Sequence, residues 1–275
     1  MRLVFKRHRV FKGPEDENAK IWRYIDFTKY VSLLDTKSLY FARVDRLDDK
    51  FEGSVPNSFY PSTSPETIEL MKEYFPDSYQ SYIKESGNEL KQNKKASTIN
   101  MARRRWTFVN CWHMNEVESA AMWKLYLKSN EGVAVQTTYK FLCESFCKSE
   151  YDEWIGLVKY IDYSKDKMPS DNSNYRFVYK RKSYDYEKEL RAVIRKYPIS
   201  EKDLKSGSIS LEKLAEVGVY PEGQQIPVDL ETLVQRVYVS PYAEEWFASL
   251  VLSITEKYKL EKNVTKSSLS DDPVY

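Results

Sequence analysis

The chain has 275 residues, of which 41% are hydrophobic and 31% charged, so it can fold around a core and is not a disordered chain. Its 43 basic and 41 acidic residues leave a formal net charge of +2, which argues against a strongly basic nucleic-acid-binding protein. The short basic runs 103–105 and 180–182 suit either a solvated face or local contact with phosphate groups. The 22 Tyr, 12 Phe and 6 Trp residues fit either an aromatic core or a cleft that stacks a planar ligand.

The cysteines indicate a reducing compartment. Cys111, Cys143 and Cys147 are odd in number and sparsely spaced, so they predict no disulfide framework, and no histidine lies near enough in sequence to the latter two to indicate zinc. The first 12 residues lack the uninterrupted apolar run of a secretory signal, and no stretch approaches the ~20 apolar residues of a membrane span. We therefore expect a cytoplasmic protein with no membrane insertion.

Predicted strands and helices follow one another irregularly along the chain. Apolar and alternating segments predict strands at 21–24, 38–42, 107–112, 132–137, 157–163, 187–194, 226–230, 233–239 and 264–269. Helices are expected at 29–34, at 246–259, and after Asn115, where Glu118 would complete a capping box. Because strands and helices do not alternate strictly, we predict an α+β fold with a mixed, mainly antiparallel sheet flanked by helices.

One domain is expected to span residues 1–275. Three prolines and several Ser and Thr residues predict a loop over 54–65, and Pro65 then suits the first turn of a helix. The polar helical pattern that follows extends to about residue 95. We interpret residues 55–100 as a helical insertion in that domain.

Several common catalytic motifs are missing from the sequence. It contains neither GxGxxG nor GxxxxGK[ST] nor GxSxG, which argues against the usual dinucleotide and P-loop cradles and against a nucleophile elbow. The only histidines are His8 and His113. A histidine-dependent mechanism would therefore have to use His113 as its acid or base, and the alternative is a hydrogen-bonded structural histidine.

Glu187 and Glu189 are the leading catalytic candidates. On a strand or extended loop, residues two apart share one face, so the carboxylates would lie side by side. Neighbouring carboxylates push their pKa values apart, which suits acid–base chemistry or the gripping of a ribose hydroxyl. The alternative is a solvated charged turn in which Arg191 supplies the counter-charge.

The first predicted strand and the acidic turn supply further candidates. Arg23 offers a planar fork for phosphate or carboxylate, and Tyr24 lies beside it in sequence. Asp49 and Glu52, with Asp48, form an acidic cluster that would pair with Arg23 or take a divalent cation. The alternative is a surface turn with an internal salt bridge, and no residue is assigned as a metal ligand.

The chain resembles a bacterial family known as domain of unknown function 2971. The resemblance rests on the segments Trp22–Tyr24, Leu39–Phe41, Leu47–Gly53, Cys111–His113 with its helix, and Tyr186–Arg191. Many members read Asn-Asp-Pro-Phe in the acidic turn, where this chain has Asp48-Asp49-Lys50-Phe51. The family carries no established activity, so the resemblance implies no mechanism.

A more distant resemblance is to the ADP-ribosyltransferases. These enzymes have a split mixed sheet and carry an Arg or His on the first strand, then a Ser- or Tyr-containing motif, then a Glu that ends an E-x-E in one branch. Arg23, Tyr40 and Glu187-Lys188-Glu189 occur here in that order, whereas the Ser-Thr-Ser motif of the arginine-modifying branch is not found at 107–112.

The roles implied by that resemblance concern NAD as co-substrate. Arg23 would bind its phosphates or ribose, and Tyr40 would stack on nicotinamide. Glu189 would hold the ribose hydroxyl, and Glu187 would position the acceptor. The implied function is an NAD-consuming toxin or phage-defence effector. The alternatives are a non-catalytic sensing or interaction module of a defence locus, with a protein partner, and a nucleic-acid-directed protein.

Overall fold

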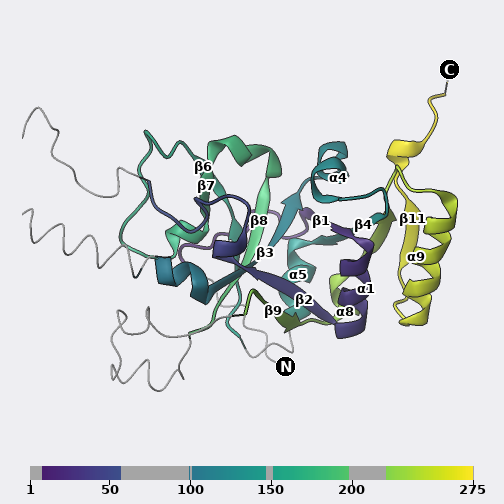
Figure 1. Ribbon diagram of the computed structural model, residues 1–275, viewed down its shortest axis with the longest axis horizontal. Coiled ribbons are helices and arrows are strands. Elements are labelled where there is room, and N and C mark those ends of the chain that lie inside the picture. The colour runs from purple at the N-terminus through teal and green to yellow at the C-terminus, as the bar shows by residue number, and fades with distance from the viewer. Residues whose placement is uncertain (1–7, 57–98, 100, 147–150, 198–220, 275) are drawn as a thin grey trace, which may run out of the picture.

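A computed structural model describes residues 8–56, 99, 101–146, 151–197 and 221–274. It shows an α+β fold built on a mostly antiparallel sheet with helices against it (Figure 1). The predicted insertion at 55–100 lies almost entirely outside the described residues. The strands of the large sheet are β1 (Lys20–Asp26), β2 (Ser38–Arg43), β3 (Thr107–Met114), β4 (Gly132–Thr138), β5 (Trp154–Leu157), β8 (Glu189–Arg195), β9 (Gly223–Pro227), β10 (Arg236–Val239) and β11 (Asn263–Lys266).

The helices and the second, two-stranded sheet complete the described fold. The α-helices are α1 (Phe27–Thr36), α4 (Ala120–Tyr126), α5 (Tyr139–Ser145), α8 (Leu230–Leu233) and α9 (Glu245–Lys257). The small parallel sheet pairs β6 (Lys159–Ile161) with β7 (Tyr179–Arg181). Short 3₁₀ helices are η1 (Val44–Arg46), η4 (Tyr175–Phe177), η5 (Lys182–Glu187) and η6 (Ser268–Ser270).

The large sheet branches at β3. One edge of β3 pairs with β8 over seven residues, and β8 pairs in turn with β5. The other edge pairs with β2 near its start, through Val109 and Phe108, and with β1 near its end, through His113 and Met114. The two branches continue as β2–β9 and as β1–β4–β10–β11, where only the β10–β11 pairing is parallel. The sheet is therefore split between β1 and β2.

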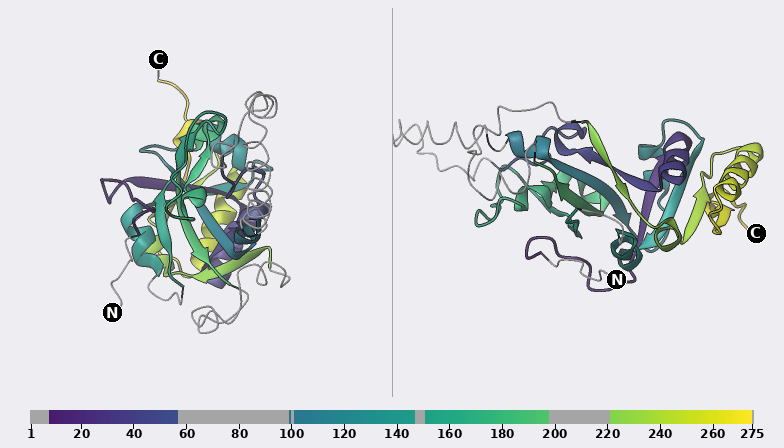
Figure 2. Two further views of the ribbon diagram at one scale, coloured as in Figure 1. Left: turned by 90° about the vertical axis from the view of Figure 1, so that its left-hand side faces the viewer. Right: turned by 90° about the horizontal axis from the view of Figure 1, so that it is seen from below.

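Apolar residues of one face of the sheet pack under the helices α1, α5, α8 and α9. On β8 the alternate residues Leu190, Ala192 and Ile194 enter this core, because successive side chains of a strand point to opposite faces. Figure 2 shows α9, in yellow, at the end of the molecule where β11 also lies. The opposite face of β8 carries Glu189, which contacts Lys180 of β7, and Arg191, which contacts the Phe177 carbonyl of η4.

Several element boundaries differ from the sequence predictions. The strand expected at 157–163 is two strands, β5 and β6, and the strand expected at 226–230 ends at Pro227 before helix α8. Asn115 does not cap α4, which starts at Ala120 with the Ser119 hydroxyl as its N-cap. The Glu118 carboxylate instead accepts from Trp123 Nε1 and Ser267 Oγ, so tertiary partners replace the local capping box.

Candidate functional site

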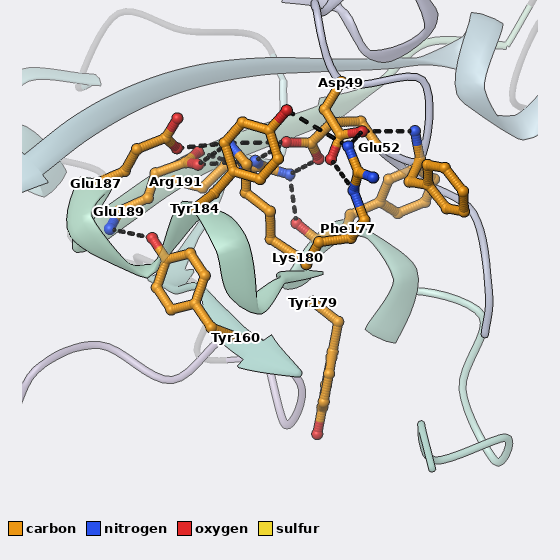
Figure 3. A network of polar contacts seen from close by, with 12 residues as sticks. Asp49, Glu52, Tyr160, Phe177, Tyr179, Lys180, Tyr184, Glu187, Glu189 and Arg191 are labelled. Carbon is orange, nitrogen blue, oxygen red and sulfur yellow. Dashed lines mark hydrogen bonds and ion pairs between the residues drawn. The ribbon is translucent and has the colours of Figure 1, made fainter. Parts of the chain in front are cut away.

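A fully buried arginine organises the charged face of β8. Arg191 is 0% exposed and has five N–H donors, all of which have acceptors in reach. Its Nε and Nη2 donate to the Glu189 carboxylate at 2.6 and 2.9 Å, and its Nη1 and Nη2 donate to Glu52 at 2.9 and 3.0 Å. A fifth bond runs from Nη1 to the Phe177 carbonyl at 3.2 Å (Figure 3). These bonds hold Glu52 against β8. Glu52 is therefore buried, and the surface turn that the sequence offered as an alternative does not describe it.

Lys180 lies among three carboxylates. Its Nζ is 2.5 Å from Glu187 Oε2, 3.1 Å from Glu52 Oε1 and 3.3 Å from Glu189 Oε2. Burial disfavours the ammonium charge, but the carboxylates of Glu189 and Glu52 outweigh burial and raise the pKa of Lys180. The ring of Tyr184 covers this ammonium, with its centroid 4.9 Å from Nζ. Lys180, the first residue of the basic run 180–182, is therefore buried in the network and is not part of a solvated patch.

The network extends to Asp49 at its other end. Asp49 is 4% exposed and accepts from Arg181 Nε and Nη2 at 3.1 and 2.7 Å. The Arg181 guanidinium also lies 4.4 Å from the centre of the Phe51 ring. In Figure 3 the polar groups run from Glu187 at one end to Asp49 at the other. Asp49 and Glu52 thus pair with β7 and β8, and the predicted pairing of the acidic turn with Arg23 is wrong.

The two glutamates of the E-x-E segment do not belong to one regular strand. Glu187 ends η5, Lys188 adopts a left-handed conformation with φ of 41°, and β8 begins only at Glu189. The sequence predicted that strand alternation would align the two carboxylates. That prediction is wrong, because the two residues do not share a strand. They meet because both bind the Lys180 ammonium, and the backbone reversal at Lys188 leaves Glu187 at the end of the network.

Their environments shift the two pKa values in opposite directions. Burial raises the pKa of Glu187, and the neighbouring Lys180 ammonium only partly offsets that effect. Burial also acts on Glu189, but Arg191 and Lys180 reverse it and lower the pKa of this carboxyl to about 2. Glu189 is thus ionised at neutral pH, whereas Glu187 is the more basic carboxylate. Such divergence is typical of acid–base pairs.

Arg23 approaches the same cluster from the split in the sheet. Its Nη1 donates to the Cys111 carbonyl at 2.6 Å, just beyond the point where β1 and β3 cease to pair. Burial lowers the pKa of Arg23, while Cys111, Tyr126 and Glu189 lie close enough to oppose that effect. The sequence does not show whether Arg23 and Glu189 meet in space, and the structure places Arg23 near enough for the Glu189 charge to act on it.

Tyr126 and Tyr186 lie near enough to Glu187 for its charge to act on their hydroxyls. They are 45% and 46% exposed, and for both residues burial and the charge of Glu187 raise the phenol pKa. Cys111, which donates a hydrogen bond to Glu189, has its thiol pKa raised by burial and by the Glu189 charge. A thiol with a raised pKa is a poor nucleophile, so Cys111 is a structural member of the cluster.

His113 and Tyr24 border the cluster without being central to it. His113 Nδ1 is 2.6 Å from the Glu187 carbonyl, and burial lowers the pKa of its imidazole. Its Nε2 is buried with no hydrogen-bond partner in the described part of the chain. The Tyr24 hydroxyl accepts from the Ser119 amide at 2.7 Å, and its ring packs edge-on against Trp123. Tyr24 is therefore held by the α4 segment.

Tyr40 is not brought to the glutamates by any contact among the described residues. It lies on β2, its ring packs directly over Gly223 of β9, and it is 47% exposed. Its carbonyl accepts from the Asn110 side chain at 2.9 Å. The partly exposed tyrosines whose hydroxyls the Glu187 charge reaches are instead Tyr126 and Tyr186.

The residues that sequence reasoning missed are Lys180 and Tyr126, and it gave Arg191 only the role of a surface counter-charge. Arg191 had a usable signal, because it interrupts the apolar run Leu190–Ile194 in a strand that is otherwise suited to a core. A charged residue there needs a buried partner. Lys180 had no comparable signal, since its partners lie on other elements and the 180–182 run resembles any short basic patch.

Two kinds of site are not seen in the part of the chain that the structure describes. There, no three His, Cys, Asp or Glu side chains gather as a metal-binding group. No described helix is long and apolar enough to cross a membrane.

Comparisons with family models, with curated proteins and with solved structures found no match to this chain. The chemistry of the cluster therefore has to be argued from its own geometry.

Proposed function

We propose that the protein consumes NAD, breaking the bond between nicotinamide and ribose and transferring the ADP-ribosyl group to a hydroxyl acceptor or to water. The observation that carries the proposal is the divergence of Glu187 and Glu189, two carboxyls on one ammonium with opposite pKa shifts. The order of Arg23 and the E-x-E segment, which resembles that of ADP-ribosyltransferases, supports it. Membership in the domain of unknown function 2971 family remains part of the same proposal.

In this proposal Glu187 is the general base. The C1′–N bond breaks, its electron pair stays on the ring nitrogen, and neutral nicotinamide leaves. A C1′–O bond forms to the acceptor, whose proton passes to the Glu187 carboxylate. A base with a raised pKa removes that proton more effectively than an ordinary carboxylate does. Glu187 lies at the end of the network, its side chain is 11% exposed, and its charge reaches the hydroxyls of the partly exposed Tyr126 and Tyr186, which supports contact with a substrate.

Glu189 receives a different role from the one that the resemblance implies. Both of its oxygens are occupied by Arg191 and Lys180, and the residue is 4% exposed. It is therefore a positioning residue that fixes Lys180 beside Glu187, and it does not touch the ribose. Tyr126 and Tyr186 replace Tyr40 as the rings that stack on nicotinamide, and Arg23 supplies positive charge for the phosphates.

The proposed setting is the bacterial cytoplasm, where NAD is available and a toxin or phage-defence effector would act on it. The free thiols of Cys111 and Cys143 support a reducing compartment.

The test is nicotinamide release from NAD by the purified protein and by the variant Glu187→Gln. We expect the variant to lose at least about a hundredfold in rate, the lower range for removal of a general base. Its unfolding temperature should stay equal or rise, because the buried ionised carboxylate is removed. Glu245→Gln, on the exposed side of α9, is the matched control and should keep full activity. Equal turnover in wild type and Glu187→Gln, or no turnover in wild type, would refute the proposal.

A further inference from the structure

A cavity of about 870 Å³ lies over β1, β4 and β10, apart from the glutamate cluster. Its floor is a row of residues paired across these three strands, Trp22, Gln136 and Arg236, which share one face of the sheet. Neither Arg23 nor Glu187 lines it. The cavity is within the size range of small-molecule sites, which is about 300–1,000 Å³.

Gln136 is a buried polar side chain without a partner. The residue is only 7% exposed, it lines the cavity, and its side-chain amide has no hydrogen bond within the described ranges. The amide is not among the buried, unpaired polar atoms of the described residues, so it is accessible from the cavity. A bound molecule with a donor beside an acceptor would pair with both the amide oxygen and the amide nitrogen.

Arg236 adds one free positive charge beside Gln136. The two residues face each other on neighbouring strands, and no carboxylate pairs with Arg236 in the described residues. The lysines at the rim differ from it, because Lys20 lies 3.8 Å from Glu116 and Lys262 lies 3.2 Å from Glu231. The cavity therefore offers one anion-binding group and not a track for a polyanion.

The remaining lining is partly aromatic and partly acidic. Trp22, Phe141 and Tyr238 contribute ring surface, and the rings of Trp22 and Tyr238 lie 5.1 Å apart. Glu118 is held by Ser267, Ser268 and Trp123, and Glu144 is an exposed carboxylate of the lining. Ring surface, an amide and a single guanidinium select for a flat molecule with one anionic group.

We propose that this cavity binds a small planar ring compound that carries a single anionic group, either a nucleoside monophosphate or an aromatic carboxylate. The ring lies against the aromatic lining, its hydrogen-bonding edge meets the Gln136 amide, and its phosphate or carboxylate binds Arg236. The site is distinct from the proposed NAD chemistry, because residues 115–119 separate the cavity from the Glu187–Lys188 turn: Asn115 accepts from Trp22 on one side and from Lys188 on the other.

The test is calorimetric titration of the full-length protein with adenosine 5′-monophosphate, adenosine and nicotinate. Saturable binding of at least one of the two anions is expected, at least about tenfold tighter than adenosine, since a hydrogen bond to a charged group is stronger than one between neutral groups. A preference for the monophosphate identifies the nucleotide, and a preference for nicotinate identifies the aromatic carboxylate. Arg236→Gln should remove the preference for the anion. Lys262→Gln, at the paired rim lysine, is the control and should change affinity less than threefold.

Gln136→Met gives an independent reading. The variant should lose binding, because the amide that meets the edge of the ring is gone, and without ligand it should unfold at the same temperature as wild type, because Met keeps a similar side-chain length and volume. The proposal is overturned if neither anion saturates the wild-type protein, if Arg236→Gln leaves the anion preference intact, or if Gln136→Met retains binding.

Discussion

The two faces of β8 are buried equally well but by opposite chemistry. On one face Leu190, Ala192 and Ile194 are 0% exposed under the apolar core. On the other, Glu189 and Arg191 are 4% and 0% exposed within an ion network. Burial of apolar surface stabilises by about 25 cal/mol per Å², whereas removal of a charge from water costs several kcal/mol that its partners must offset. Because a protein that needed only stability would not require the second face, we propose that the ion network serves the chemistry of Glu187.

The largest effect on stability is expected when the central positive charge of the network, Arg191, is removed. We expect Arg191→Met to destabilise the protein by about 3–5 kcal/mol, because Glu52 and Glu189 would keep buried negative charge without their main partner. Urea-induced unfolding measures the change. A loss below about 1 kcal/mol would mean that the network is solvated and not buried as described.

The pH dependence of stability tests whether Glu189 is the carboxyl with the lowered pKa. Its pKa in the folded protein is about 2, below the usual 4.5, so it contributes stability at pH values above 4.5 that is lost as the pH falls towards 2. We expect Glu189→Gln to be less stable at pH 7 and to lose less stability than wild type between pH 5 and pH 3. Thermal unfolding across this range measures it. Parallel curves for the two proteins would contradict the assignment.

A substitution on the apolar face of the same strand provides the matched contrast. Ile194→Val removes one buried methyl group and should cost about 0.5–1.5 kcal/mol, with no dependence on pH. Urea unfolding at pH 7 and pH 4 checks both statements. A pH-dependent penalty would show that the two faces of β8 are not energetically separate.

The smallest effect is expected at an exposed ion pair. Lys266 and Glu245 are 2.7 Å apart, but their side chains are 32% and 83% exposed. Lys266→Ala should change the free energy of unfolding by at most about 0.5 kcal/mol, and added salt should erase even that. A larger loss would remove the distinction between buried and surface pairs on which the comparison rests.

The sequence predicted the fold class and most strands because their signals are local. The apolar segment 132–137 and the helix at 246–259 correspond closely to β4 and α9. It also singled out Glu187, Glu189 and Arg23. What it missed depends on long-range contacts: Lys180 reaches Glu52, which is distant in the sequence, and the left-handed backbone at Lys188 replaces the expected strand. No local pattern encodes either feature.

The most direct test of the account is to titrate the two glutamates separately, by following the side-chain carboxyl carbons of Glu187 and Glu189 with ¹³C NMR from pH 7 downwards. The account predicts that Glu187 takes up its proton above the usual pKa of 4.5, whereas Glu189 stays ionised until about pH 2. Protonation of both carboxyls near 4.5, or of Glu189 before Glu187, would contradict the division into an acid–base residue and a fixed anion.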